Sequence, residues 1–433
     1  MTVRPTFAER LLPNPGKNVP YLDAIRGIAV LFILIRHTWG LSGEPNYTVM
    51  GHSLSPIIAM MSSGVDLFFV LSGVLLSARF LRADASGHPA PTFGEYMKAR
   101  LLRIGPPYWV VLLIVLVIYT PSMIPNDRIW SSYGAFMALA HLTFTQSLFI
   151  VSFGAYMVVA PFWTLTVEMV FYLILPVMVR AFYGFRWWQG IVASFAIAAA
   201  WLYACKFSMD PLVNFIRTHA FGLAYSEPGV RFFLAHQIIG YLPHFAVGCG
   251  ISAILQHKGR GSLVSAKAGI VYVCIGAAVL IGSMAVLGRF HVMQGFGNPE
   301  TLLASSTRGA MIYYFLESMP FAVAYGLIIL GVSLSPDVVK IGISRVPTLT
   351  LFGVLGYSVY LIHMPLLMTL NQHAVLADGN PATHFPKMMA LGTVVVLAFA
   401  YGLFMAVERP SLRWSAGVRR AHQPSVDPSG ALN

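Results

Sequence analysis

Two ionisable side chains stand on one face of the first apolar segment, residues 22–40. Arg26 and His37 are eleven positions apart in LDAIRGIAVLFILIRH, so on a helix they point within about 20° of each other. A rise of 1.5 Å per residue separates them by about 16 Å along the axis. Ionisable groups inside a membrane span are costly and mark functional sites, so we expect a ligand to lie along this face. The alternative is that Arg26 anchors the span and His37 reaches the headgroups.

Two carboxylates are predicted to lie at a depth similar to that of His37. Asp66 opens the apolar run VDLFFVLSGVLL, and Glu168 lies in FWTLTVEMVFYLILP. In the segment that contains Glu168, the residues Thr164, Glu168 and Tyr172 follow one helical stripe at i, i+4 and i+8. A carboxylate beside an imidazole holds it in one tautomer, so we expect Asp66 or Glu168 to orient His37. Helix capping by Asp66 and an interhelical hydrogen bond from Glu168 are the alternatives.

A pair of arginines stands at the start of a third apolar segment. Arg100 and Arg103 in KARLLRIGPPYW are spaced i, i+3 and therefore share a helix face. Paired guanidinium groups bind phosphate bidentately, which predicts a phosphate site. The alternative is that the pair sets membrane topology or binds anionic lipid.

A later segment, YSVYLIHMP, brings a phenol and an imidazole together. Tyr360 and His363 are spaced i, i+3, and Pro365 follows. Proline removes a backbone hydrogen bond and kinks a helix, so we expect this segment to border a cavity. The alternative for His363 is a hydrogen bond to a neighbouring helix.

The composition predicts that these groups sit in a membrane. Charged residues make up 10% of the 433 residues, against about 25% in an ordinary soluble domain, and hydrophobic residues make up 57%. The net charge of +12 is expected to mark cytoplasmic loops rather than a nucleic-acid partner. Cys205, Cys249 and Cys274 stand singly, which argues against a disulfide framework or a metal site.

Eleven apolar segments are candidates for membrane spans, which need about 20 residues each. They cover 22–40, 56–80, 104–120, 133–152, 163–182, 188–205, 231–256, 267–288, 310–333, 349–371 and 386–407. If the basic loops all face the cytoplasm, one segment between Arg103 and Arg180 does not cross. The segment 133–152 carries the polar run His141, Thr143, Thr145, Gln146 and Ser147, so we expect it to be broken or re-entrant and to line a cavity. The alternative is an ordinary eleventh span.

The predicted fold is therefore an all-α transmembrane bundle with about ten crossings, one broken segment and both termini in the cytoplasm. Residues 1–20 are expected to form a cytoplasmic segment, 21–412 the membrane domain, and 413–433 a disordered cytoplasmic tail. The expected location is the inner, or plasma, membrane, where membrane lipid surrounds the chain.

Six motifs taken together resemble the acyltransferase family 3 of integral membrane acyltransferases. In order, they are LDAIRGIAVLFILIRH, GVDLFFVLSGVLL, RLLRIGPPYW, FWTLTVEMVFYLILP, YSVYLIHMP and VERP. They extend from about residue 20 to 412, which is nearly the whole chain. Ala24 replaces a usual glycine and Thr164 a usual serine, and threonine keeps the hydroxyl group.

The resemblance implies transfer of an acyl group, usually acetyl, from cytoplasmic acyl-coenzyme A to a hydroxyl of a carbohydrate or glycosylated acceptor. By motif, it assigns the essential histidine to His37 and its arginine partner to Arg26, while Arg100 and Arg103 match the arginine pair. No metal is expected. The further candidates for substrate or oxyanion binding are Trp163, Thr164, Tyr360 and His363.

In the expected mechanism, the arginines hold the coenzyme A phosphates at the inner face and His37 removes the acceptor proton near the thioester. Acylation of His37 itself is the alternative route. The rival function is a transporter or flippase, which would also have a broken helix and ionisable groups within the membrane. Many transporters show internal repeats, and none is evident in this sequence.

Overall fold

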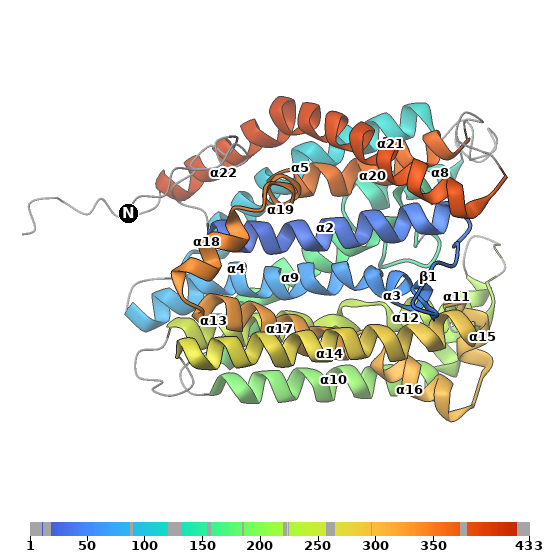
Figure 1. Cartoon of the computed structure of the whole chain (residues 1–433), viewed down its shortest axis with the longest axis horizontal. Helices are drawn as coiled ribbons and strands as arrows, with labels where there is room; N and C mark the ends of the chain where they lie inside the picture. Colours follow the sequence, from blue (N-terminus) through green and yellow to red (C-terminus); the bar gives the residue numbers. More distant parts are fainter. Residues whose placement is uncertain are drawn as a thin grey trace, which may run out of the picture.

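The computed structural model is a bundle of long helices that run roughly along one axis (Figure 1). The structure describes residues 11, 19–86, 90–119, 131–153, 157–183, 186–219, 223, 225–256, 265–295, 297–372 and 379–421. The helices that make up most of the bundle are α2 (Pro20–Leu41), α4 (Gly64–Ser86), α5 (Phe93–Ile118), α9 (Trp163–Met178), α10 (Trp187–Phe207), α13 (Ile238–Gln256), α14 (Ala266–Met293), α17 (Met319–Leu334), α20 (Gly356–Gln372) and α21 (Pro381–Leu403).

Shorter elements extend or connect these helices. They are α3 (Ser55–Ala59), η2 (Met60–Ser63), α8 (Ser132–Leu142), η3 (Met157–Phe162), η4 (Val179–Phe182), α11 (Asp210–Thr218), α12 (Glu227–Ala235), α15 (Pro299–Ala304), α16 (Arg308–Leu316), α18 (Asp337–Ser344), α19 (Pro347–Val354), the π-helical turn η7 (Phe404–Glu408) and α22 (Arg409–Ala421). One small antiparallel hairpin, β1 (Thr48–Val49) with β2 (His52–Ser53), is the only sheet in the described chain.

The number of membrane-spanning helices agrees with the predicted ten crossings. Among the described residues, eight helices are long and apolar enough to span, and the total is ten if each of two bent pairs forms one span. The bent pairs are α16 with α17, which turn by 41°, and α19 with α20, which turn by 83°. The all-α, multi-pass prediction is therefore confirmed, while the side of the membrane that each terminus faces stays a prediction.

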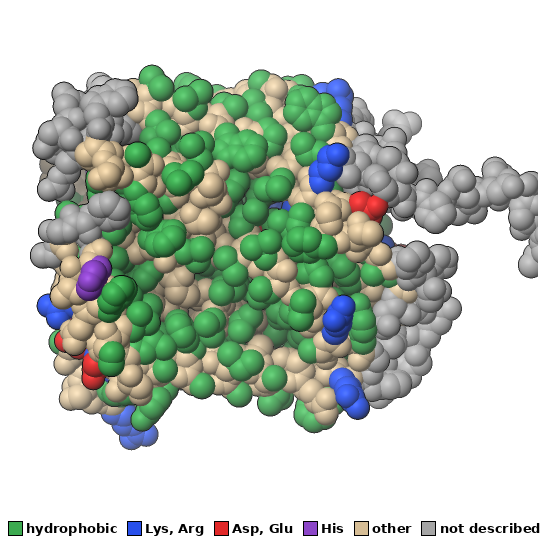
Figure 2. Space-filling model, turned by 180° about the vertical axis from the view of Figure 1, so that it is seen from behind, with side chains coloured by type: hydrophobic (Ala, Val, Ile, Leu, Met, Phe, Trp, Pro, Cys, Tyr) green, Lys and Arg blue, Asp and Glu red, His purple; other side chains and the backbone are tan. Residues whose placement is uncertain are grey.

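The surface of the bundle carries the apolar band that a bilayer requires. Figure 2 shows hydrophobic side chains across the middle of one face and charged side chains at its two edges. Leu113 and Val117 on α5 and Val394 on α21 are each more than 60% exposed. So much exposed apolar surface would be unfavourable in water, so the fold requires lipid around this surface.

Within its described residues, the segment predicted to be broken contains only a short helix. Helix α8 has eleven residues, or about 16 Å at 1.5 Å per residue, against the roughly 30 Å of a hydrocarbon core. The chain after α8 is irregular, and side chains donate hydrogen bonds to backbone carbonyls on either side of it. The Tyr108 hydroxyl donates to the His141 carbonyl at 2.7 Å, and the Gln146 amide donates to the Phe162 carbonyl at 2.8 Å. Irregular backbone is tolerated at membrane depth where protein groups supply such partners.

The predicted disordered tail differs from what the structure contains. Helix α22 continues to Ala421, so its residues 413–421 are helical, and the remainder, 422–433, lies outside the described residues. The helix packs on α5, because the Ser415 hydroxyl donates to the Ala99 carbonyl at 2.7 Å and the Ser411 hydroxyl to the Arg103 carbonyl at 3.2 Å. These contacts hold α22 against the turn of α5 that carries Arg100 and Arg103.

Glycines let α19 approach α2 closely enough for α20 to run beside it. A Cβ atom on Gly27 would lie 2.0 Å from the backbone carbonyl oxygen of Leu349, and one on Gly353 would lie 1.8 Å from the backbone carbonyl oxygen of Asp23. Neither distance is physically possible, so both positions require glycine if the helices keep this spacing. The close approach places the start of α20 beside Arg26 and its later turns beside His37.

Candidate active site

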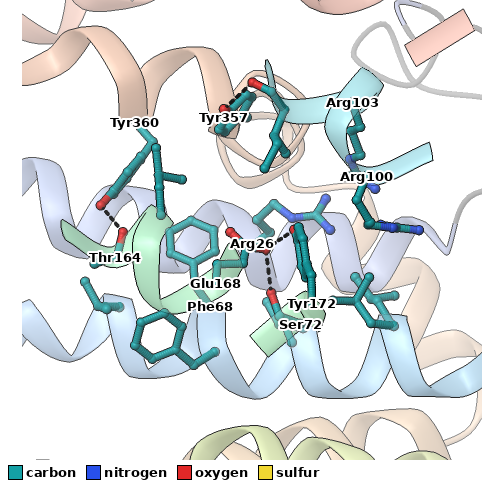
Figure 3. Close-up of a pocket in the computed structure, with 18 residues that line it drawn as sticks. Arg26, Phe68, Ser72, Arg100, Arg103, Thr164, Glu168, Tyr172, Tyr357 and Tyr360 are labelled. Carbon is teal, nitrogen blue, oxygen red and sulfur yellow. Dashed lines mark hydrogen bonds between the residues drawn. The ribbon is translucent and has the colours of Figure 1, made fainter. Parts of the chain in front are cut away.

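An elongated cavity inside the bundle contains most of the residues singled out by sequence. It is bordered by α2, α4, α5, α9 and α20, and we call it the arginine cavity because Arg26, Arg100 and Arg103 all line it. In Figure 3, Arg100 and Arg103 lie at one end of the cavity, and the hydroxyl groups of Thr164 and Tyr360 lie at the other.

The arginine end holds positive charge that the described protein neutralises only in part. Arg26 donates to the Asp23 carboxylate at 2.5 Å. Arg100 is 6% exposed and lies over the ring of Tyr96 at 5.8 Å, yet its buried Nε atom has no hydrogen-bond partner in the described chain. A buried donor and charge without a partner are costly, so this end of the cavity is suited to an anionic ligand.

Glu168 occupies the middle of the same cavity rather than the side of His37. It accepts hydrogen bonds from the Tyr172 hydroxyl at 2.5 Å and the Ser72 hydroxyl at 3.1 Å, as Figure 3 shows. Glu168 and Tyr172 are on α9 and Ser72 is on α4, so the carboxylate joins these two neighbouring helices. No hydrogen bond joins Glu168 to His37 in the described structure.

Two hydroxyl groups close the far end of the cavity. The Tyr360 hydroxyl is within hydrogen-bonding distance of both the Thr164 hydroxyl and the Pro161 carbonyl. The sequence analysis chose Thr164 and Tyr360 separately, and the structure brings them together across α9 and α20. Trp163, the residue before Thr164, lines a different cavity.

His37 pairs with His363 just beyond Tyr360. The Nδ1 atom of His37 lies 2.9 Å from the Nε2 atom of His363, and the two rings stack with centroids 5.0 Å apart. The ring of Tyr360 is 5.8 Å from that of His363. Sequence reasoning therefore selected both histidines but did not connect them, because they lie on α2 and α20, 326 residues apart.

The contacts of His363 determine which nitrogen of each ring carries a proton. Its Nδ1 atom faces the carbonyl oxygens of Tyr360 at 2.7 Å and Val359 at 3.1 Å, and carbonyls only accept, so Nδ1 is protonated. In a neutral imidazole, Nε2 of His363 then accepts, and Nδ1 of His37 must donate to it. This arrangement leaves Nε2 of His37 with a free lone pair, as a general base requires.

Asp66 does not orient His37, which corrects one of the two predicted roles. Its Oδ1 atom lies 2.8 Å from Nε2 of His244, a fully buried residue of α13. No role was predicted for His244 from the sequence. An ionisable residue within an apolar span was itself a signal for a site, but only the packing of α4 against α13 identifies its partner.

Another buried carboxylate, Glu408, received no predicted role from its position in the VERP motif. It is buried in the π-helical turn η7 and accepts a hydrogen bond from the Ser358 hydroxyl of α20 at 2.5 Å. Ser358 lies two residues after Gly356, which lines the arginine cavity. Glu408 therefore fixes the end of α20 that borders the cavity beside Arg26.

Comparison with known proteins assigns the chain to a family. A family model described as an acyltransferase domain matches residues 19–405. The exopolysaccharide production protein ExoZ of Rhizobium meliloti is 26% identical over 357 residues, covering 81% of this chain and 90% of ExoZ. No solved structure matches.

Other relatives match over shorter stretches. Nodulation protein 10 of Rhizobium leguminosarum is 23% identical over 214 residues, which are 44% of this chain and about half, 53%, of that protein. The peptidoglycan O-acetyltransferase OatA of Listeria monocytogenes is 25% identical over 174 residues, or 38% of this chain and 25% of OatA. Because the family model covers nearly all of its bundle, the protein belongs to the acyltransferase family 3 and is a multi-pass membrane acyltransferase.

Proposed function

We propose that the protein transfers an acyl group, most simply acetyl, from acyl-coenzyme A to a carbohydrate hydroxyl, with His37 as the general base. The observation that carries this proposal is the arginine cavity, where Arg26, Arg100 and Arg103 converge and the Nε atom of Arg100 has no described partner. Coenzyme A is polyanionic, so its phosphates would supply the missing acceptors.

The shape of the cavity supports a direction for the donor. Its phosphates would bind at Arg100 and Arg103, which face the cytoplasm in the predicted topology. The pantetheine arm would extend past Arg26 toward Thr164 and Tyr360, the end of the cavity beside the histidine pair. The thioester would then meet an acceptor in the outer half of the membrane, so that only the acyl group needs to cross.

The chemical step transfers the acyl group from the thioester sulfur of the donor to the hydroxyl oxygen of the acceptor. Nε2 of His37 removes the proton from the acceptor hydroxyl as its oxygen attacks the thioester carbonyl carbon. A carbon–oxygen bond forms, the carbon–sulfur bond breaks, and the proton on His37 passes to the departing thiolate. The hydroxyl groups of Thr164 and Tyr360 are the described donors best placed to stabilise the developing oxyanion.

His363 takes the orienting role in this scheme. By accepting from Nδ1 of His37, it fixes the tautomer that leaves Nε2 as the base. Glu168 instead holds Tyr172 and Ser72 along the donor path and offsets part of the arginine charge.

The names of the relatives support a carbohydrate acceptor. OatA is named for peptidoglycan O-acetylation and ExoZ for exopolysaccharide production. Both names refer to glycans, which supports a carbohydrate hydroxyl as the acceptor of this protein.

Substitution of His37 tests the proposal most simply. We expect His37→Ala to lower acetyl transfer by about 10²–10⁴-fold, the usual contribution of a positioned base. The measurement is release of free coenzyme A thiol by purified protein supplied with acetyl-coenzyme A and a glycan acceptor. Gel filtration checks that the variant remains folded, and near-normal transfer by a folded variant would contradict the role of His37.

Substitution of His363 tests the orienting hydrogen bond. We expect His363→Leu to lower kcat by about 10–100-fold with little change in the KM for acetyl-coenzyme A, since the donor phosphates bind elsewhere. His363→Gln keeps an oxygen that can accept from His37 Nδ1, and it should recover part of the lost kcat. Equal kcat values for the Leu and Gln variants would show that the hydrogen bond has no part in catalysis.

The double substitution Arg100→Ala with Arg103→Ala tests the donor site. Hydrogen bonds to charged groups contribute about 1.5–3 kcal/mol each, so the KM for acetyl-coenzyme A should rise at least tenfold. Arg345→Ala is the matched control, because Arg345 is exposed between α18 and α19 and does not line the cavity. An unchanged KM in the double variant would return the pair to a purely topological role.

A further inference from the structure

A second cavity lies beside the arginine cavity and has a different chemical character. Residues of η2, α4, α9, α10, α12, α13, α15, α16 and α17 border it. We call it the acidic cavity, and the residues that characterise it are Asp66, Trp163, His236, Tyr241, Phe315 and Glu317. None of these residues lines the arginine cavity.

Charge distinguishes the two cavities. No Lys or Arg is among the described residues that line the acidic cavity, whereas two carboxylates, Asp66 and Glu317, do so. Both carboxylates are held in place: Asp66 by His244 at 2.8 Å, and Glu317 by the Tyr313 hydroxyl at 3.2 Å. A site without a cationic side chain offers no partner for phosphates, so it is unsuited to the polyanionic donor.

The carboxylates are nevertheless able to accept further hydrogen bonds. An ionised carboxylate only accepts and has about four acceptor positions. Among the described residues, Glu317 accepts through Oε1 alone, which leaves its Oε2 atom available to a ligand. Hydroxyl groups, which donate, are the natural partners of such an atom.

Aromatic rings form the other part of the wall. The rings of Trp163 and Tyr241 are 5.5 Å apart, and that of His236 lies 6.2 Å from Trp163. Flat aromatic surfaces combined with a few fixed polar groups are typical of small-molecule sites. A sugar ring matches both features, because its C–H faces cover aromatic rings while its rim carries hydroxyl donors.

The two cavities meet where acyl transfer would take place. Val65 lines both of them, Asp66 follows it in the acidic cavity, and Trp163 directly precedes Thr164 of the arginine cavity. A ligand in the acidic cavity would therefore lie next to the end of the arginine cavity that Thr164 closes.

We propose that the acidic cavity binds the neutral carbohydrate part of the acceptor, stacked on Trp163 and Tyr241 and hydrogen-bonded to Asp66 and Glu317. This inference rests on the proposed function and adds the acceptor site to it. The hydroxyl to be acylated would point from this cavity toward the thioester, and an acceptor carrying phosphate near that hydroxyl would be excluded by the carboxylates.

The experiment measures sugar binding directly, without transfer. Saturation-transfer difference NMR is recorded on the purified full chain with methyl α-glycosides of glucose, galactose, mannose and rhamnose at millimolar concentration. We expect at least one glycoside to give signals that fall at least fivefold in Trp163→Ala and are largely retained in Trp163→Phe. Trp188→Ala is the matched control, since Trp188 is 52% exposed on α10, outside the cavity, and its signals should match those of the unmodified protein.

Three outcomes would overturn the assignment. They are the absence of any glycoside signal, signals that Trp163→Ala leaves unchanged, and signals lost when saturating coenzyme A is added, which would place the sugar in the arginine cavity. Retention of the signals with coenzyme A present supports two separate cavities.

The design also separates this inference from the proposed function. Trp163-dependent sugar binding without acetyl transfer would support the cavity and contradict the proposed reaction. Acetyl transfer to a glycan without Trp163-dependent binding would support the proposed reaction and contradict the assignment of the acidic cavity. A methyl glucosaminide that gives stronger signals than every neutral glycoside, and loses them in Glu317→Gln, would overturn the neutral class in favour of a cation.

Discussion

The structure depends on how a lipid-embedded bundle accommodates buried guanidinium groups. A charge removed from water costs several kcal/mol unless a partner compensates it. Asp23 compensates Arg26, but Arg100 is 6% exposed and its Nε atom has no partner in the described chain. The packing of α22 on α5 and the hydrogen bond from Ser358 to Glu408 stabilise the walls around this charge. We infer that the site is completed by an anionic donor rather than by the protein.

The two cavities divide the chemistry by charge. One has three arginines and suits phosphates, while the other has two carboxylates and aromatic rings and suits neutral hydroxyl groups. Because Val65 lines both cavities, the proposed donor and acceptor would meet inside the bundle.

Much of the fold could be predicted because lipid imposes simple length and polarity rules. The polar residues of 133–152 and the positions of the basic loops together identified the segment that contains α8, and the structure has a helix of only eleven residues there. The prediction of disorder was wrong for residues 413–421, because a basic sequence with Gly and Ser resembles a disordered one. Its helix α22 is held by contacts with α5 that no local pattern contains.

The sequence identified individual residues of the site but not which of them contact each other. Helical spacing placed Arg26 and His37 on one face, and the structure has Arg26 in the cavity and His37 beyond its far end. The partners of His37 and Asp66 are His363 and His244, which come from distant helices. Periodicity reveals which face of a helix a residue occupies, but only the packing of helices determines what that face meets.

The orientation of the donor is the central claim, and a cryo-electron microscopy map of the protein with a non-hydrolysable acetyl-coenzyme A thioether tests it most directly. We expect phosphate density beside Arg100 and Arg103 and the acyl end near His37. Phosphate density at the Thr164 end, or in the acidic cavity, would contradict it.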